Sequence, residues 1–125
     1  MSPKLTSSRY TRQAEKMFLP NAGGISVLLV PTAPTHYTIS EVQADPIAKN
    51  SALGHFAHFA NVVDLCAVAL PASTYPATEL SGQNPEPATD EGNKARLPFG
   101  VTLLGPRFAD NVVLDLGQRF LKAVN

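Results

Sequence analysis

The sequence has no tryptophan, a single cysteine and no excess of charge of either sign. Ten basic residues balance ten acidic ones, so the chain has no net attraction for nucleic acid or for an anionic membrane surface. Aromatic side chains that could stack on bases are also few. We therefore expect neither a nucleic-acid partner nor a membrane partner.

Long apolar runs are missing as well. No stretch approaches the ~20 apolar residues of a membrane span, and the first residues lack the apolar core of a signal peptide. Cys66 has no second cysteine to pair with, which fits a reducing compartment. These features predict a cytoplasmic protein. Its 125 residues, 44% of them hydrophobic, are enough for one globular domain.

The chain does contain alternating helical and strand-like segments. Residues 1–7 are polar and are expected to be loose, and the Pro- and Gly-rich stretch 74–96 is expected to be a flexible loop insertion. A turn is expected at residues 20–24, and one helical turn, capped by Ser40, is expected before Pro46. Apolar spacing predicts the longer elements: helices at 8–18, 51–65 and 111–123, and strands at 25–30, 67–70 and 99–104.

This order predicts an α/β fold, with a partial mixed sheet of about three short strands and about three helices. The expected strands are apolar without alternation, which is typical of strands buried on both faces. Three helices are too few to cover both faces of such a sheet. The pattern therefore indicates part of a larger sheet.

Most chemical motifs are absent from the sequence. His55 and His58 are three residues apart, but no further cysteine, histidine or carboxylate completes a metal site, so an exposed histidine pair is the favoured interpretation. Cys66 has no basic neighbour in sequence and is expected to be a buried, inert thiol. There is no Gly-rich phosphate loop and no G-x-S-x-G elbow. We expect no metal and no cofactor.

His36 and Tyr37 are the best candidates for a binding site. They follow the carboxyl end of an apolar strand, where open α/β sheets place their ligands, and Pro31 and Pro34 stiffen the loop before them. A rigid loop that only packs on the fold remains the alternative.

Three stretches resemble one enzyme family. "FANVVDLCAVALPAS" (59–73) and "LPFGVTLLGPRFAD" (97–110) resemble late motifs of the amidase-signature family, in which a short hairpin usually joins the two. "LLVPTAPTHYTISEVQADPIAKNSALG" (28–54) resembles the allophanate hydrolase branch, which includes urea amidolyases. Asp64 also resembles that branch, since generic amidases tend to have glycine there. The likeness covers about residues 10–124, and Ser73 departs from it where the motif has glycine.

The resemblance implies amide hydrolysis by a serine nucleophile, a second serine with a cis peptide bond and a lysine. In the allophanate hydrolase branch the substrate is allophanate, an intermediate of urea degradation. The motifs that carry these catalytic residues lie upstream of the region matched here. No serine or lysine of this sequence stands in the matching context, so no catalytic residue is assigned and activity of the chain alone is left open.

Three hypotheses follow. In the first, residues 1–125 are the C-terminal segment of an amidase domain, from a truncated gene product or an incomplete gene model. Such a chain would be inactive alone, and in a full-length parent it would supply sheet strands and one wall of the pocket for a small amide. The pocket residues would then be Thr35, His36, Tyr37 and Asn61. The alternatives are a non-catalytic interaction module that self-associates or pairs with an N-terminal amidase segment, and a degenerate product without function.

Overall fold

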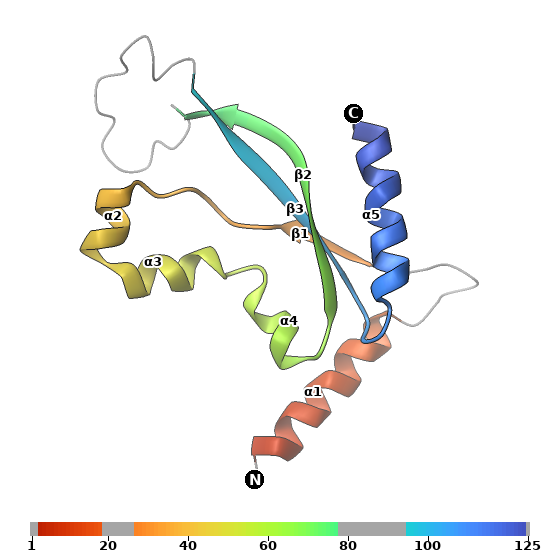
Figure 1. The fold of residues 1–125 in the computed structure, drawn as a ribbon. Coiled ribbons are helices and arrows are strands. Elements are labelled where there is room, and N and C mark those ends of the chain that lie inside the picture. The colour runs from red at the N-terminus through yellow and green to blue at the C-terminus, as the bar shows by residue number, and fades with distance from the viewer. Residues whose placement is uncertain (1–2, 19–26, 78–94, 125) are drawn as a thin grey trace.

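The computed structural model describes residues 3–18, 27–77 and 95–124. The predicted turn at 20–24 and most of the predicted loop at 74–96 therefore lie outside the described residues. Figure 1 shows a small sheet with the C-terminal helix along one side, the short helices of residues 39–62 on the other side, and the N-terminal helix near the point where the last strand leads into the C-terminal helix. The elements in chain order are α1 (Pro3–Met17), β1 (Leu28–Pro31), α2 (Ile39–Ala44), α3 (Pro46–Leu53), α4 (His58–Val62), β2 (Cys66–Pro76), β3 (Arg96–Gly105) and α5 (Asp110–Val124).

The sheet has the order β1-β3-β2, so β3 is the central strand. Leu29 faces Leu103 across the β1–β3 pair, and Val68 faces Leu103 across the β2–β3 pair. The predicted α/β class and the three strands are confirmed. The expected mixed sheet is wrong in one respect, because both described pairings are antiparallel. The described helices number five rather than about three.

Strands β2 and β3 extend further than predicted and form a long hairpin (Figure 1). Residues 74–76 and 96, expected in the loop, belong to these strands. Pro71 does not end β2, because its nitrogen points away from β3 and no ladder hydrogen bond needs it. The register shifts between Pro71 and Ser73, which marks a β-bulge where the hairpin bends.

The core lies between the sheet and α5. Leu70, Val101, Leu103 and Val113 are its buried centre. The predicted stripe of α5 is confirmed: Val113 is 1% exposed, and three half-buried residues pack around the core, namely Leu116, Phe120 and Leu121. Gly117 is buried, and a Cβ there would lie 3.3 Å from a methyl group of Leu70. A glycine at this position therefore lets α5 approach β2 closely.

The predicted helix at 51–65 is wrong, because two short helices and a turn replace it. Asp45 caps α3, with its Oδ1 accepting from the Ala48 N–H at 3.1 Å, and Pro46 occupies the first helical turn. Gly54 ends α3. Before it, α2 is capped by Thr38 rather than by Ser40, since Thr38 and Glu41 form a reciprocal capping box.

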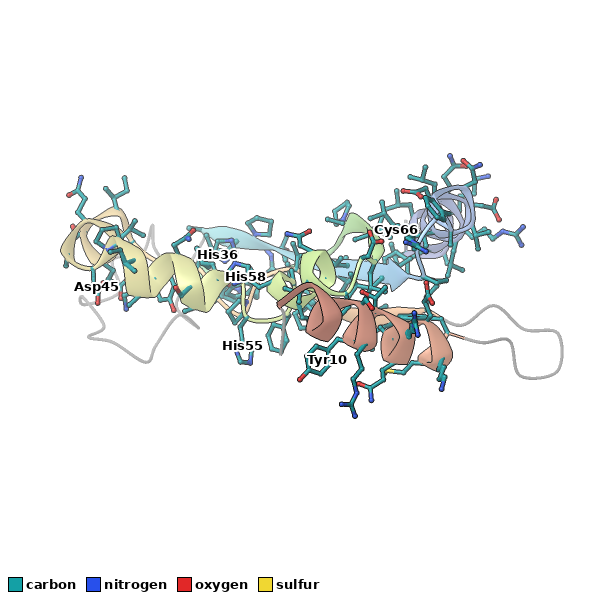
Figure 2. The ribbon with its side chains drawn as sticks, turned by 90° about the horizontal axis from the view of Figure 1, so that it is seen from below. Tyr10, His36, Asp45, His55, His58 and Cys66 are labelled. Carbon is teal, nitrogen blue, oxygen red and sulfur yellow. The ribbon has the colours of Figure 1, made fainter. Side chains whose placement is uncertain are left out.

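Helix α1 begins at Pro3, so the expectation of a loose segment over 1–7 is wrong for residues 3–7. Figure 2 shows α1 and α5 on opposite sides of the sheet. Ala14 is buried, but Tyr10 and Met17 of the predicted apolar face are 51% and 73% exposed. None of the helices in the described part of the chain is long and apolar enough to cross a membrane.

Strand β1 does not have the predicted burial on both faces. Leu28 is 37% exposed and Leu29 is 52% exposed, although adjacent strand residues point to opposite faces. Leu29 shares the face of Leu103 and α5, but α5 packs on β2 and β3. One edge of the sheet therefore carries apolar side chains that the described residues leave in contact with solvent.

Candidate functional site

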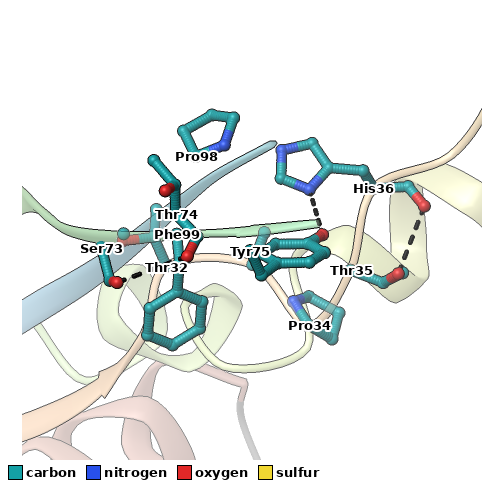
Figure 3. A pocket seen from close by; sticks show the side chains of 11 residues that line it. Thr32, Pro34, Thr35, His36, Ser73, Thr74, Tyr75, Pro98 and Phe99 are labelled. Atoms are coloured by element: carbon teal, nitrogen blue, oxygen red, sulfur yellow. Dashed lines mark hydrogen bonds between the residues drawn. The ribbon is translucent and has the colours of Figure 1, made fainter. Parts of the chain in front are cut away.

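The candidate site is a hollow, lined by apolar, hydroxyl and imidazole side chains, that lies where β1 ends. The chain leaves the sheet at Thr32, whose N–H donates to the Gly100 carbonyl oxygen at 2.9 Å. It then runs beside the distal half of the β2–β3 hairpin and encloses a volume of about 610 Å³. Figure 3 shows the side chains that line this hollow. They come from three segments: Thr32, Ala33, Pro34, Thr35 and His36; Ser73, Thr74 and Tyr75; and Pro98, Phe99 and Gly100.

A hydrogen bond between His36 and Tyr75 joins the two sides of the hollow. The His36 Nδ1 lies 2.5 Å from the Tyr75 hydroxyl, and the two rings are tilted by 48° with their centroids 5.7 Å apart. If the hydroxyl donates to Nδ1, then Nε2–H remains a donor. If Nδ1–H donates to the hydroxyl, then Nε2 remains an acceptor. The pair can therefore offer either a donor or an acceptor to a polar molecule.

Hydroxyl groups and one guanidinium fix the rest of the site. The Thr32 and Thr102 hydroxyls are 2.9 Å apart, which holds the start of the loop against β3. Arg96 binds Thr74 twice, with Nε donating to Oγ1 at 2.6 Å and Nη2 donating to the carbonyl oxygen at 2.7 Å. Among the described residues that line the hollow, none has a charged side chain. The hollow therefore suits a small, neutral, polar group better than an ion.

The described residues of the hollow hold no arranged nucleophile. Ser73 donates to the Thr74 carbonyl oxygen at 3.4 Å and is not hydrogen-bonded to His36. A serine needs a base within hydrogen-bond reach to become a nucleophile. The hollow can bind and orient a polar molecule, but its own geometry does not activate a serine.

The structure brings together two of the four residues predicted to bind substrate. Thr35 and His36 line the hollow. Tyr37 follows them but does not line it, and its ring lies 4.5 Å below the Lys49 Nζ in a cation–π contact. Asn61 is exposed on α4, outside the hollow.

Sequence reasoning missed the partners of His36. Tyr75, Thr74 and Phe99 belong to the hairpin, and two of these positions fall in the segment predicted as a flexible loop. The signal was the pair Thr74 and Tyr75, two residue types that are enriched in strands, shortly after Pro71. Its pairing with residues 96–99 depends on a contact between distant parts of the chain, which local patterns do not reveal.

The other candidates are separate from the hollow. His55 lies in the turn after α3 and His58 begins α4, so they do not share one continuous helix face, and both are exposed. Cys66 is half-buried rather than fully buried, and its Sγ donates to the Pro106 carbonyl oxygen at 3.2 Å. Across the described ranges, no group of three or more His, Cys, Asp or Glu side chains could hold a metal ion.

Comparison with known proteins shows that the chain is similar to part of two urea amidolyases. The chain is 38% identical over 98 residues to a urea amidolyase of Lachancea kluyveri and 33% identical over 100 residues to a urea amidolyase of Saccharomyces cerevisiae. These matches cover 78% and 80% of this chain, but the chain spans only 4% of the length of each of these relatives. No protein-family model matches the chain.

Solved structures give the same result. The fold matches a Kluyveromyces lactis allophanate hydrolase with a TM-score of 0.65 and 27% identity, over 97% of this chain and 16% of that chain. It matches the K. lactis urea amidolyase with a TM-score of 0.63 and 28% identity, over 94% of this chain and 6% of that chain. In sequence and in fold, the chain is therefore related to one segment of urea amidolyases and allophanate hydrolases.

Proposed function

We propose that this chain is the C-terminal segment of an amidase domain of the allophanate hydrolase type. It acts by pairing with an N-terminal segment that supplies the catalytic Ser-Ser-Lys residues, and it does not hydrolyse amides alone. The observation that carries the proposal is the likeness over nearly the whole chain to a small part of much longer enzymes. The amidase-signature motifs described above, together with the lack of a serine or lysine in catalytic context, support it.

In the paired enzyme, the hollow forms one wall of the substrate pocket. His36 and Tyr75 are rigidly joined and retain hydrogen-bonding capacity, which suits recognition of the C=O and N–H groups of an amide. Thr35 adds a second polar group on the same side. The substrate class we propose is a small linear amide such as allophanate, whose neutral amide groups would face this hollow while the N-terminal segment would hold its carboxylate.

The experiment is co-expression with a complementing segment. The K. lactis allophanate hydrolase, shortened so that it lacks the part that resembles this chain, is produced with and without this protein. Ammonia release from allophanate and from simple amides is then measured. We expect activity from the pair and none above a buffer blank from this chain alone. Turnover by this chain alone that is lost on changing one of its polar residues would contradict the proposal.

Variants of the hollow test its role in the pair. We expect His36→Ala and Tyr75→Phe to raise KM or lower kcat about tenfold, the effect of losing roughly 1.4 kcal/mol of binding. His55→Ala and Tyr10→Phe are matched controls, since both residues are exposed and lie outside the hollow. Unchanged kinetics in both hollow variants would remove His36 and Tyr75 from the substrate wall.

A second candidate function is a non-catalytic interaction module. Large exposed apolar side chains favour it, among them Ile39, Ile47 and Phe108, which are 78%, 81% and 86% exposed. Such a module would bind a partner without any gain of amide hydrolysis. The co-expression assay separates the two candidates, because only the first restores activity.

A further inference from the structure

We propose that the outer edge of β1, which no other described strand pairs with, is the docking site for one short strand of the N-terminal amidase segment, which extends the sheet beyond β1. This inference rests on the proposed function and names the surface through which the two segments pair. Three observations support it: the exposed apolar side chains of β1, the outward-facing backbone groups of β1, and the similarity of the chain to one part of longer proteins.

The described residues do not cover the side chains of β1 as their apolar composition requires. Leu28 and Leu29 point to opposite faces of the strand and are 37% and 52% exposed. A strand that is apolar on both faces is typical of a sheet interior rather than of a sheet edge. The opposite edge differs: on β2, Val68 and Leu70 pack under α5, and the exposed side chains Ala67 and Ala69 are small.

The backbone of β1 has groups ready to pair. The Thr32 N–H bonds to the Gly100 carbonyl oxygen, and the register aligns Leu29 with Leu103. Because antiparallel ladders alternate, Val30 and Leu28 bond toward β3, whereas Leu29 turns its N–H and C=O outward. Pro31 is the next outward-facing residue and has no N–H. The edge can therefore accept a short strand centred on Leu29.

The occupant is inferred from the relatives. In the two solved structures the matching fold is 6% and 16% of a longer polypeptide. A segment that is one part of a larger chain in its relatives has surfaces that the rest of that chain can cover. We therefore commit to the N-terminal amidase segment as the occupant, in preference to a second copy of this protein or an unrelated protein.

The test uses substitutions at Leu29 with a matched control. The full chain is co-expressed with a tagged form of the shortened K. lactis allophanate hydrolase, and the amount that co-purifies is measured. Leu29→Lys removes the apolar contact, and Leu29→Pro also removes the outward N–H while leaving the bonds to β3. Leu29→Val keeps both features. Leu114→Lys is the control, since Leu114 is a leucine of α5 that is 51% exposed.

We expect Leu29→Lys and Leu29→Pro to reduce co-purification about tenfold, the size of a loss at a buried contact. Leu29→Val and Leu114→Lys should stay within about twofold of the unchanged chain, as expected for changes away from the contact. Thermal melts of each variant alone check that the fold is kept.

Three outcomes would overturn the inference. Co-purification that is equal for all variants would move the docking site elsewhere and leave the proposed function standing. Failure of the unchanged chain to co-purify would overturn both. A homodimer of this chain that Leu29→Lys dissociates, without binding to the tagged segment, would replace the proposed occupant with a second copy.

Discussion

Asp64 and Phe108 have positive φ angles, 60° and 66°, and in the described part of the chain no other non-glycine residue does. Asp64 lies between α4 and β2, and its Oδ2 accepts from Arg107 Nη1 at 3.2 Å. The left-handed conformation is tolerated by aspartate better than by most residues with a Cβ. The positive φ also gives a physical reason for the glycine that generic amidases tend to have at this position.

Substitutions at Asp64 distinguish how much its backbone conformation and its charge each contribute to the free energy of unfolding. Asp64→Gly removes a weak surface ion pair but suits the positive φ, so we expect the free energy of unfolding to change by less than about 0.5 kcal/mol. Asp64→Ala should lower it by about 1–2 kcal/mol, since alanine adds the cost of a left-handed Cβ. Urea unfolding measures both values, and equal stability of the two variants would contradict this explanation.

Glu41 predicts a pH dependence at the start of α2. Hydrogen bonds from the Thr38 backbone N–H, at 2.7 Å, and from its hydroxyl, at 2.9 Å, lower the pKa of Glu41 below its usual value. Since the pKa is lower in the folded state, the stabilisation is complete above the unfolded pKa and is lost as the pH falls through the folded pKa. We expect the Thr38 amide proton to shift in NMR spectra with that lowered pKa. A Glu41→Gln variant should show no such titration.

At the scale of elements, regular apolar spacing predicted the helices and strands of the core correctly, whereas prolines predicted strand ends incorrectly. The core of β3 and the stripe of α5 followed from spacing, because both elements bury one continuous apolar surface. The ends of β2 and β3 did not follow from spacing. Proline usually ends a strand, but Pro71, Pro76 and Pro98 lie within these paired strands. The prediction of one helix at 51–65 was wrong because a separate short helix, α3, begins after Asp45 and ends at Gly54.

The site was predictable in part for the same reason. The position of His36 beside the hollow could be predicted because it follows a strand, which is a local signal. Tyr75 was missed because its role depends on the hairpin that brings it to His36, 39 residues away in the sequence. Tyr37 does not line the hollow because adjacent loop residues can point in different directions, here toward Lys49.

The junction of β3 and α5 gives a prediction about packing. A Cβ on Gly105 would lie 2.5 Å from Val113 Cγ2 and 3.3 Å from Cys66 Sγ. Gly105→Ala should therefore lower the free energy of unfolding by about 1–3 kcal/mol through overpacking. Val113→Ala removes the obstructing methyl group, so the double variant should be more stable than the sum of single effects predicts, by at least about 0.5 kcal/mol. Strict additivity in chemical unfolding would contradict this contact.

At the scale of the whole molecule, stability is concentrated in one layer. Residues 101–105 of β3 are all buried, and α5 packs across β2 and β3. Helix α1 is attached by Ala14 and by an ion pair of 3.7 Å between Glu15 and Arg107, a contact that is exposed on both sides. No residue of α2 or α3 is buried.

This distribution predicts a graded pattern of hydrogen exchange. Amides of β3 and α5 should exchange slowest, because opening them requires loss of the core. Amides of α1, α2 and α3 should exchange at least about tenfold faster, because they open without exposing that core. Exchange followed by mass spectrometry on the isolated chain gives both rates. Protection of α1 equal to that of β3 would show that α1 is part of the cooperative core.

The prolines of the outer strands limit how the sheet can grow. Pro31 on β1 and Pro71 and Pro76 on β2 occupy positions whose nitrogen faces away from β3. An incoming strand finds an unbroken run of donors on neither edge, so it can pair over only a few residues. Fibril formation requires long, open-ended strand stacking from chain to chain. Any aggregates that this chain forms should therefore be amorphous and should resist conversion into amyloid.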